Sequence, residues 1–103
     1  GRQMDGCPAP IEVIGDIVDA VGDKLEVILD GGVRRGTHIL KALAMGAKAC
    51  MGGRSYLYGL AAGGEEGAYR SLNLLKDEVE NNMILLGCKD VSQISAKHIR
   101  KWK

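Results

Sequence analysis

The chain has 103 residues, the length of one ordinary domain, and its 46% hydrophobic and 26% charged residues are typical of a soluble globular protein. A net charge of +1 provides no basic field for nucleic acid, and no apolar run approaches the ~18 residues needed to span a bilayer. The three cysteines are scattered without metal-ligand spacing, which favours a reducing, cytoplasmic setting and no metal site.

Two features of the composition favour a portion of an α/β protein over a self-sufficient small domain. Glycine contributes 15 residues, whereas aromatic residues make up 4% and phenylalanine is absent. Small domains usually rely on aromatic side chains for much of their core area. A chain rich in glycine and aliphatic residues is better suited to short elements joined by loops that line a ligand site.

Apolar periodicity predicts alternating helices and strands. A helix is expected over residues 10–21, with Pro10 at its first position. A strand is expected over residues 25–29, buried on both faces as in a parallel sheet. The elements that follow are a helix over 38–45 capped by Thr37, a strand over 48–51, a helix over 56–62 broken by Gly63 and Gly64, and a long helix over 65–86 ended by Gly87.

The turn after the first strand, residues 30–37, reads Asp-Gly-Gly-Val-Arg-Arg-Gly-Thr and gives the strongest signal in the chain. Its glycines let the backbone approach a ligand closely, and the start of the next helix offers free N–H groups to an anion. Arg34 and Arg35 can each bind a phosphate through a forked pair of hydrogen bonds. Asp30, at the strand end, is suited to accept hydrogen bonds from hydroxyl groups such as those of a ribityl chain.

A second glycine-arginine turn, Gly53-Arg54, directly follows the second strand. Because both strands are expected to be parallel, both turns should lie at the same edge of the sheet. In barrels, the loops after the seventh and eighth strands often form a phosphate site. The two turns together therefore predict phosphate binding rather than two solvent-exposed loops.

The predicted order is helix, strand, helix, strand, helix, helix, which is typical of a βα-repeat architecture. Two strands cannot close a barrel, and a complete (β/α)8 barrel has about 250 residues. The expected fold is therefore α/β, with residues 1–103 forming a C-terminal fragment of a TIM barrel domain.

The remaining polar residues give weaker signals. His38 begins a helix, where a cation is disfavoured, so a neutral, structural role is expected. His98 lies in a basic tail, where docking or exposure is expected, and neither histidine has a serine or cysteine neighbour in sequence that indicates a triad. Arg2 can bind a substrate carboxylate, although solvent exposure is the default for an arginine.

Several segments together carry a family resemblance: Gly-Arg-Gln-Met-Asp at 1–5, the turn at 30–37, Lys-Ala-Leu-Ala at 41–44, and Gly53-Arg54. With these residues the chain resembles FMN-dependent 2-hydroxy acid oxidases and dehydrogenases, such as glycolate oxidase and lactate oxidase. The resemblance extends over essentially the whole chain. Three positions depart from it, because the family usually has Asp at His38, an aliphatic residue at Gly52 and Pro at Ser55.

The resemblance implies a (β/α)8 barrel that binds FMN, oxidises a small L-2-hydroxy acid to the 2-oxo acid, and forms a homo-oligomer at full length. It implies that Arg2 binds the substrate carboxylate. In the family pattern His-Gly-Gly-Arg-Gln the catalytic histidine precedes Gly1, so the chain itself supplies no catalytic base. The implied FMN-binding residues are Asp30, Gly31, Gly32, Val33, Arg34, Gly53 and Arg54, with the last three at the phosphate.

Two other interpretations remain open. The chain could be an inactive truncated fragment that folds, or binds phosphate, only with a missing partner half. A barrel enzyme of other chemistry, such as a nucleotide dehydrogenase or an isomerase, is a weaker alternative against which Arg2-Gln3 argues. Within the resembled family, oxygen, a quinone and a cytochrome are all open as electron acceptors.

Overall fold

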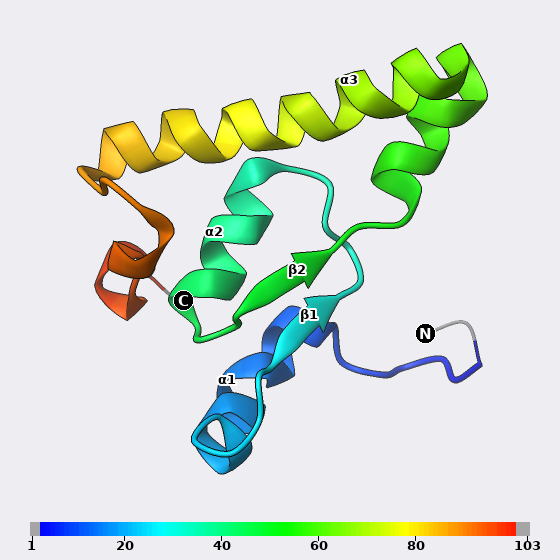
Figure 1. Cartoon of the computed structure of the whole chain (residues 1–103). Coiled ribbons are helices and arrows are strands. Elements are labelled where there is room, and N and C mark those ends of the chain that lie inside the picture. Colours follow the sequence, from blue (N-terminus) through cyan, green and yellow to red (C-terminus); the bar gives the residue numbers. More distant parts are fainter. Residues whose placement is uncertain (1–2, 101–103) are drawn as a thin grey trace.

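A computed structural model of the chain describes residues 3–100. Helix α1 (Pro10–Val21) leads to strand β1 (Ile28–Asp30), helix α2 (Gly36–Ala44) and strand β2 (Ala49–Met51), as Figure 1 shows. The long helix α3 (Arg54–Leu86) follows, and the chain ends in two short 3₁₀ helices, η1 (Val91–Gln93) and η2 (Ala96–His98). The predicted order of elements is confirmed.

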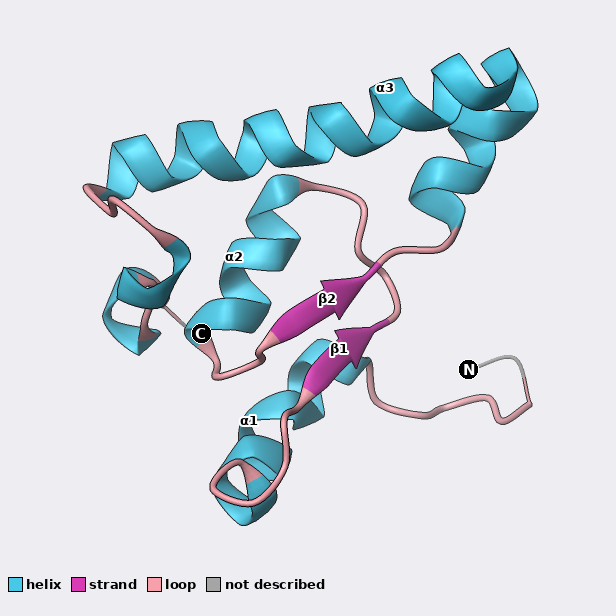
Figure 2. Cartoon of the chain, viewed as in Figure 1, coloured by secondary structure: helices cyan, strands magenta, loops and turns pink. Residues whose placement is uncertain are grey.

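The two strands form a parallel sheet in which Ile28 pairs with Ala49 and Asp30 pairs with Met51. Helix α2 makes the crossover between the strands, and Figure 2 shows α3 running across α2, with α1 lying beside β1, against which it packs. This βαβ unit with parallel strands is the arrangement that the sequence pattern predicts. Both strands end at the same edge, which is where the two glycine-arginine turns begin.

Two apolar clusters hold these layers together, and α2 contributes to both. The first cluster joins α1, β1 and α2 through Ile14, Leu29, Val33, Ala42 and Ala47. The second joins the opposite side of α2 to the C-terminal segment through Leu40, Ala44, Cys88 and Ile94. Helix α2 is therefore the central element on which the described residues pack.

The predicted first strand is wrong in two respects. It begins at Ile28 rather than residue 25, and only Leu29 of its three residues is buried. Ile28 is 51% exposed and Met51 is 56% exposed, because the described residues pack on one face of the sheet only. Burial on both faces, which a complete parallel sheet needs, is not provided within residues 3–100.

Helix α3 bends where the sequence predicts a break. Gly63 and Gly64 have non-helical backbone angles, and Gly64 has a positive φ of 61°. The bend brings the two halves of the helix against each other at Gly59 and Gly67, where a Cβ atom on either residue would collide with the backbone of the other. The first half starts at Arg54, slightly before the predicted start, and Gly87 ends the helix with a φ of 71° as predicted.

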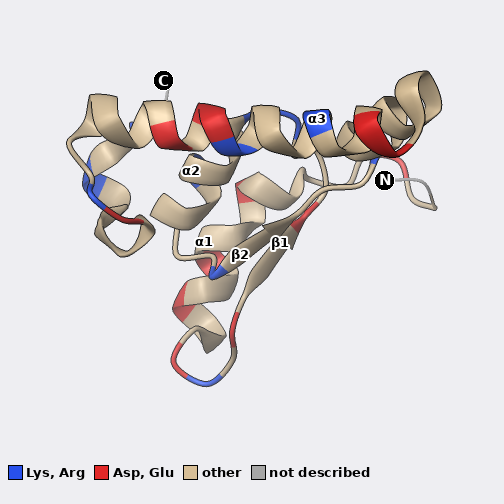
Figure 3. Cartoon of the chain, turned by 45° about the horizontal axis from the view of Figure 1, so that its top comes forward, with Lys and Arg blue, Asp and Glu red and all other residues tan. Residues whose placement is uncertain are grey.

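The surface of α3 is mixed in charge. Figure 3 shows acidic and basic residues both distributed along this helix. Within residues 3–100, no helix combines the length and the apolar composition that crossing a membrane requires.

Helices α2 and α3 approach each other closely at Gly36, the first residue of α2. A Cβ atom there would lie 2.5 Å from Cβ of Glu78 and 2.6 Å from the backbone nitrogen of Val79. Real Cβ atoms do not approach other atoms so closely, so a larger residue would force the two helices apart.

We predict that Gly36→Ala lowers stability by about 1–3 kcal/mol, the usual cost of overpacking a tight contact. Gly15→Ala is the matched control, because its Cβ would meet only Met45 Cε at 3.6 Å and alanine favours α1 by about 1 kcal/mol. Urea unfolding followed by circular dichroism measures both variants. Equal midpoints for Gly36→Ala and the unmodified chain would contradict the close contact.

Candidate functional site

The candidate site lies at the carboxyl edge of the two-stranded sheet. Asp30 and Met51 pair at the ends of β1 and β2, so the β1–α2 turn and the β2–α3 turn leave the sheet side by side. Asp30 is exposed at this edge. The structure thus brings together the two turns that the sequence singled out.

The β1–α2 turn depends on two consecutive glycines with positive φ, 112° at Gly31 and 74° at Gly32. A Cβ at Gly31 would lie 3.1 Å from Pro10 Cγ, whereas one at Gly32 would meet no atom within 4 Å. Val33 then turns into the core and is 6% exposed. Its side chain is an anchor for the turn, so only its backbone is available to a ligand.

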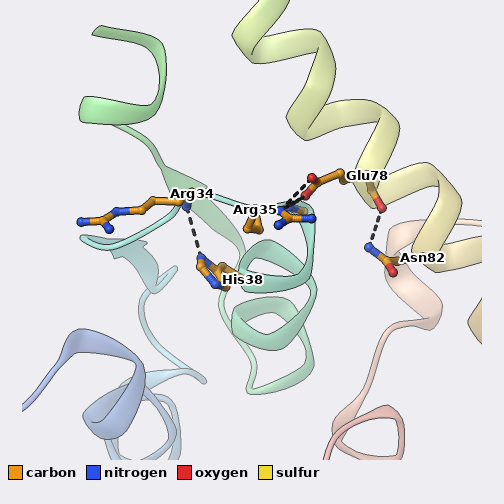
Figure 4. A network of polar contacts seen from close by, with 6 residues as sticks. Arg34, Arg35, His38, Glu78 and Asn82 are labelled. Atoms are coloured by element: carbon orange, nitrogen blue, oxygen red, sulfur yellow. Dashed lines mark hydrogen bonds and ion pairs between the residues drawn. The ribbon is translucent and has the colours of Figure 1, made fainter. Parts of the chain in front are cut away.

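The two adjacent arginines of the turn point in opposite directions, as Figure 4 shows. Arg35 extends toward α3, where its Nε lies 2.8 Å and 3.1 Å from the carboxylate oxygens of Glu78. Arg34 extends to the other side of the turn, and within residues 3–100 its guanidinium forms no ion pair. The structure therefore distinguishes the two arginines, because Arg35 is paired with Glu78 through its Nε and Arg34 has no such partner among the described residues.

The N-terminus of α2 is also occupied by Glu78. The amide of Gly36 donates a hydrogen bond of 2.6 Å to Glu78 Oε2, although Glu78 belongs to α3. Arg35, rather than the predicted Thr37, stands at the cap position, and no side chain at that position makes a capping bond. Glu78 satisfies the first amide of α2 from a distant part of the chain, so that amide is not free for an anion.

The environment of Glu78 favours its charged form. The hydrogen bond from the Gly36 amide has the largest effect and lowers the pKa of the Glu78 carboxyl, with partial burial opposing it and the hydrogen bond and positive charge of Arg35 adding to it. The carboxylate is therefore a fixed negative charge between α2 and α3 at neutral pH.

The N-terminus of α3 presents the opposite situation. Gly53 stands at its cap position without a capping side chain, and its first turn holds no acidic residue. A Cβ at Gly53 would meet no atom within 4 Å, so the space beside the helix end is open. Arg54 begins the helix and, among the described residues, forms no ion pair. Helix ends of this kind favour anions through their free amides and their partial positive charge.

Two departures from the resembled family lie against each other at this helix start. A Cβ at Gly52 would lie 2.8 Å from Ser55 Oγ, so the missing side chain at position 52 makes room for the serine hydroxyl. That hydroxyl is buried and, within residues 3–100, has no hydrogen-bond partner. The two positions are coupled, and neither change removes a group that could bind phosphate.

His38 takes part in the turn through its ring. The backbone amide of Arg34 donates a hydrogen bond of 3.2 Å to His38 Nδ1, which Figure 4 shows as a dashed line. A ring nitrogen that accepts a hydrogen bond carries no proton, so the expected neutral histidine fits this geometry. The sequence did not indicate that its partner is the backbone of the β1–α2 turn itself.

His98 lies in the C-terminal segment and contacts Cys88, with Nε2 3.7 Å from the sulfur. Its Nδ1 accepts a hydrogen bond of 3.1 Å from the amide of Ser95. No local pattern indicates the Cys88 contact, because ten positions separate the two residues. Cys88 is buried in the second apolar cluster, so His98 attaches the tail to the body of the chain.

The groups at the carboxyl edge fit a phosphate ester. They comprise two guanidinium groups without ion pairs among the described residues, one open helix N-terminus and two glycines with free space beside them. The one nearby carboxylate of the predicted set, Asp30, lies at the strand end, where a hydroxyl group is its natural partner. Arg2, the predicted substrate-binding residue, lies outside the described residues.

Comparison with known proteins identifies the family. The sequence pattern of the FMN-dependent dehydrogenases matches residues 1–101. The chain belongs to this family. It is 52% identical over 100 residues to human 2-hydroxyacid oxidase 1, covering 97% of this chain and 27% of that protein. It is 48% identical to the peroxisomal (S)-2-hydroxyacid oxidase GLO3 of Arabidopsis thaliana, covering 97% of this chain and 28% of the relative.

Solved structures of FMN-dependent dehydrogenases give the same result. The fold matches a soluble mutant of the membrane-associated (S)-mandelate dehydrogenase from Pseudomonas putida, with a TM-score of 0.91 and 39% identity, over 96% of this chain and 28% of that one. The chain therefore spans little more than a quarter of the relatives it matches, and corresponds to the C-terminal part of their FMN-binding TIM barrel. FMN is the cofactor of this family.

We predict that the stabilising effect of Glu78 disappears in acid. Because its pKa is lower in the folded chain than its ordinary value of 4.5, the stabilisation is complete above that value and is lost as the pH falls through the lower folded-state value. Glu78→Gln keeps an oxygen for the Gly36 amide but cannot carry the charge. Urea midpoints measured from pH 7 to pH 3 should differ between the two proteins at neutral pH and converge in acid. A constant difference across this range would show that the charge of Glu78 is not responsible.

Proposed function

We propose that this chain supplies the FMN phosphate site of an enzyme that oxidises a small L-2-hydroxy acid, of the lactate or glycolate type, to the 2-oxo acid. The observation that carries the proposal is the contrast between two helix starts at one sheet edge. Glu78 fills the start of α2, whereas the start of α3 is open and stands with two guanidinium groups that have no ion pair within residues 3–100.

In this proposal each residue of the two turns has a separate task. Arg34 and Arg54 bind the phosphate oxygens through their guanidinium groups, and Gly53 offers a backbone amide at the helix start. Asp30 accepts hydrogen bonds from the ribityl hydroxyls. Gly31, Gly32 and Val33 bring the backbone close to the cofactor, with Val33 anchored in the core.

Bound FMN supplies the acceptor for the two electrons that leave the α-carbon of the hydroxy acid. The contribution of this chain to that reaction is orientation. Arg2 binds the substrate carboxylate through two parallel hydrogen bonds and holds the α-carbon in position. The base that takes the hydroxyl proton is, by the family pattern, a histidine that precedes Gly1.

The names of the relatives support the substrate class, since both curated relatives are 2-hydroxyacid oxidases. We further propose that the partners are this small acid and other copies of the full-length enzyme, with no nucleic acid. A cytoplasmic location is supported by the free thiols of Cys7, Cys50 and Cys88, while the Arabidopsis relative is named as peroxisomal.

Replacing either proposed phosphate ligand should weaken FMN binding without affecting riboflavin, which lacks the phosphate. In the complete flavoenzyme that carries this chain, we expect Arg34→Ala and Arg54→Ala each to weaken FMN binding about 10- to 100-fold, the loss typical of a hydrogen bond to a charged group. Titration of apoenzyme with each flavin, followed by the quenching of flavin fluorescence, measures both affinities.

Arg70→Ala is the matched control, because Arg70 is an exposed arginine in the second half of α3, outside both turns. Its affinity for FMN should equal that of the unmodified enzyme. If Arg34→Ala and Arg54→Ala leave the preference for FMN over riboflavin unchanged, the phosphate does not bind at these turns.

The alternative of an inactive fragment makes different predictions. Under the proposal, the coding sequence directly upstream of Gly1 reads Ser-Asn-His-Gly in frame. The 103-residue chain alone should acquire no flavin absorbance when FMN is added, because other parts of the barrel contribute most of the flavin site. A stop codon at that upstream position would favour the fragment. Stoichiometric flavin absorbance of the isolated chain would show that the two turns suffice for binding.

A further inference from the structure

We propose that His38 is a positioning residue for the FMN phosphate turn, because its ring holds the backbone of Arg34, the residue that presents a guanidinium to the phosphate. The inference rests on the proposed function, since it assumes that a phosphate binds at this turn. It assigns a role in cofactor binding to a side chain that does not itself contact the cofactor.

The geometry defines the chemical state of the ring. The Arg34 amide donates to His38 Nδ1 at 3.2 Å, so Nδ1 provides a lone pair and the ring proton resides on Nε2. His38 lies in the first turn of α2 and is half-buried, which limits the orientations of its ring. The hydrogen bond spans four positions of the chain and closes the turn on the helix that follows it.

The residues on either side of Arg34 are held in place by contacts of their own, whereas the Arg34 side chain has no such contact among the described residues. Val33 is fixed by burial of its side chain, and Gly36 is fixed by the hydrogen bond to Glu78. Between them Arg34 is exposed, and within residues 3–100 its guanidinium forms no ion pair. The bond to His38 is the contact that fixes the peptide from which the Arg34 side chain departs (Figure 4).

The hydrogen bond to His38 also determines which group of Arg34 can bind a phosphate. Its amide is already used by the imidazole, so the guanidinium is the group that remains for the ligand. Holding the backbone in advance reduces the entropy lost when the side chain binds, which is how preorganisation raises affinity.

The test compares FMN and riboflavin binding to the apo form of the complete flavoenzyme. His38→Leu removes the acceptor at similar size, and His38→Asn keeps an oxygen that can accept from the Arg34 amide. His98→Leu is the matched control, because His98 also accepts a backbone amide through Nδ1, at 3.1 Å, but does so in the C-terminal segment.

We expect His38→Leu to weaken FMN binding about three- to tenfold, the effect of one backbone hydrogen bond, and to leave riboflavin binding unchanged. His38→Asn should restore the preference for FMN to within about twofold of the unmodified enzyme. His98→Leu should not alter the preference, whatever its effect on stability.

The outcomes separate the inference from the proposed function. If the unmodified enzyme binds both flavins equally, the phosphate site itself is wrong. If the unmodified enzyme prefers FMN and His38→Leu keeps that preference, or His38→Asn loses it equally, the phosphate site stands and the role of His38 is overturned.

A measurement without substitution guards against a variant that fails to fold. In holoenzyme labelled with ¹⁵N-histidine, the His38 ring should show an unprotonated Nδ1 and a protonated Nε2, as an acceptor at Nδ1 requires. The opposite tautomer would exclude the bond to Arg34 and overturn the inference.

Discussion

The carboxylate of Glu78 is the interaction on which the arrangement of the site depends. It accepts from the Gly36 amide and from Arg35 at once, and so joins the start of α2 to the middle of α3. The contact is possible only because residue 36 has no side chain, since the two helices approach closely there. One carboxylate thereby sets the spacing of two helices and neutralises one of the two helix starts at the sheet edge.

That neutralisation distinguishes the two helix starts as positions for an anion. Both helices begin at the same edge of the sheet, and by their dipoles alone both would attract a phosphate. Glu78 gives the start of α2 a negative partner of its own, and the start of α3 is left without one. In the proposed function the phosphate therefore binds at Gly53-Arg54 rather than beside Gly36-Thr37, because of the position of this single residue on α3.

The sequence could predict the parts of this arrangement that depend on local patterns. Helical periodicity, the turn glycines and the placement of both turns after strands are local properties, and the structure confirms the order of elements and the shared edge.

Two differences between prediction and structure arise from contacts between distant residues. The local pattern predicts Thr37 as the cap of α2, because nothing near residue 36 indicates a carboxylate 42 positions away. The pattern also predicts a buried β1, because Ile28 is an apolar residue typical of a core, but nothing in residues 3–100 covers its face.

The two arginines of the turn show most clearly why pattern alone was insufficient. Arg34 and Arg35 are adjacent and chemically identical, so any argument from residue type assigns them the same role. In the structure the extended backbone at Arg35, with φ −140° and ψ 152°, sends consecutive side chains to opposite sides. Glu78 lies on the side of the turn to which Arg35 points. The open N-terminus of α3 is part of the second turn at this edge, the β2–α3 turn. Two features thus give the adjacent arginines different roles: the alternating direction of their side chains and the distant carboxylate of Glu78. Arg35 fixes the turn, and Arg34 is left available to a ligand. In the segment Val-Arg-Arg-Gly, a structural arginine and an arginine available to a ligand can therefore be neighbours, because side chains along an extended backbone change direction at every residue.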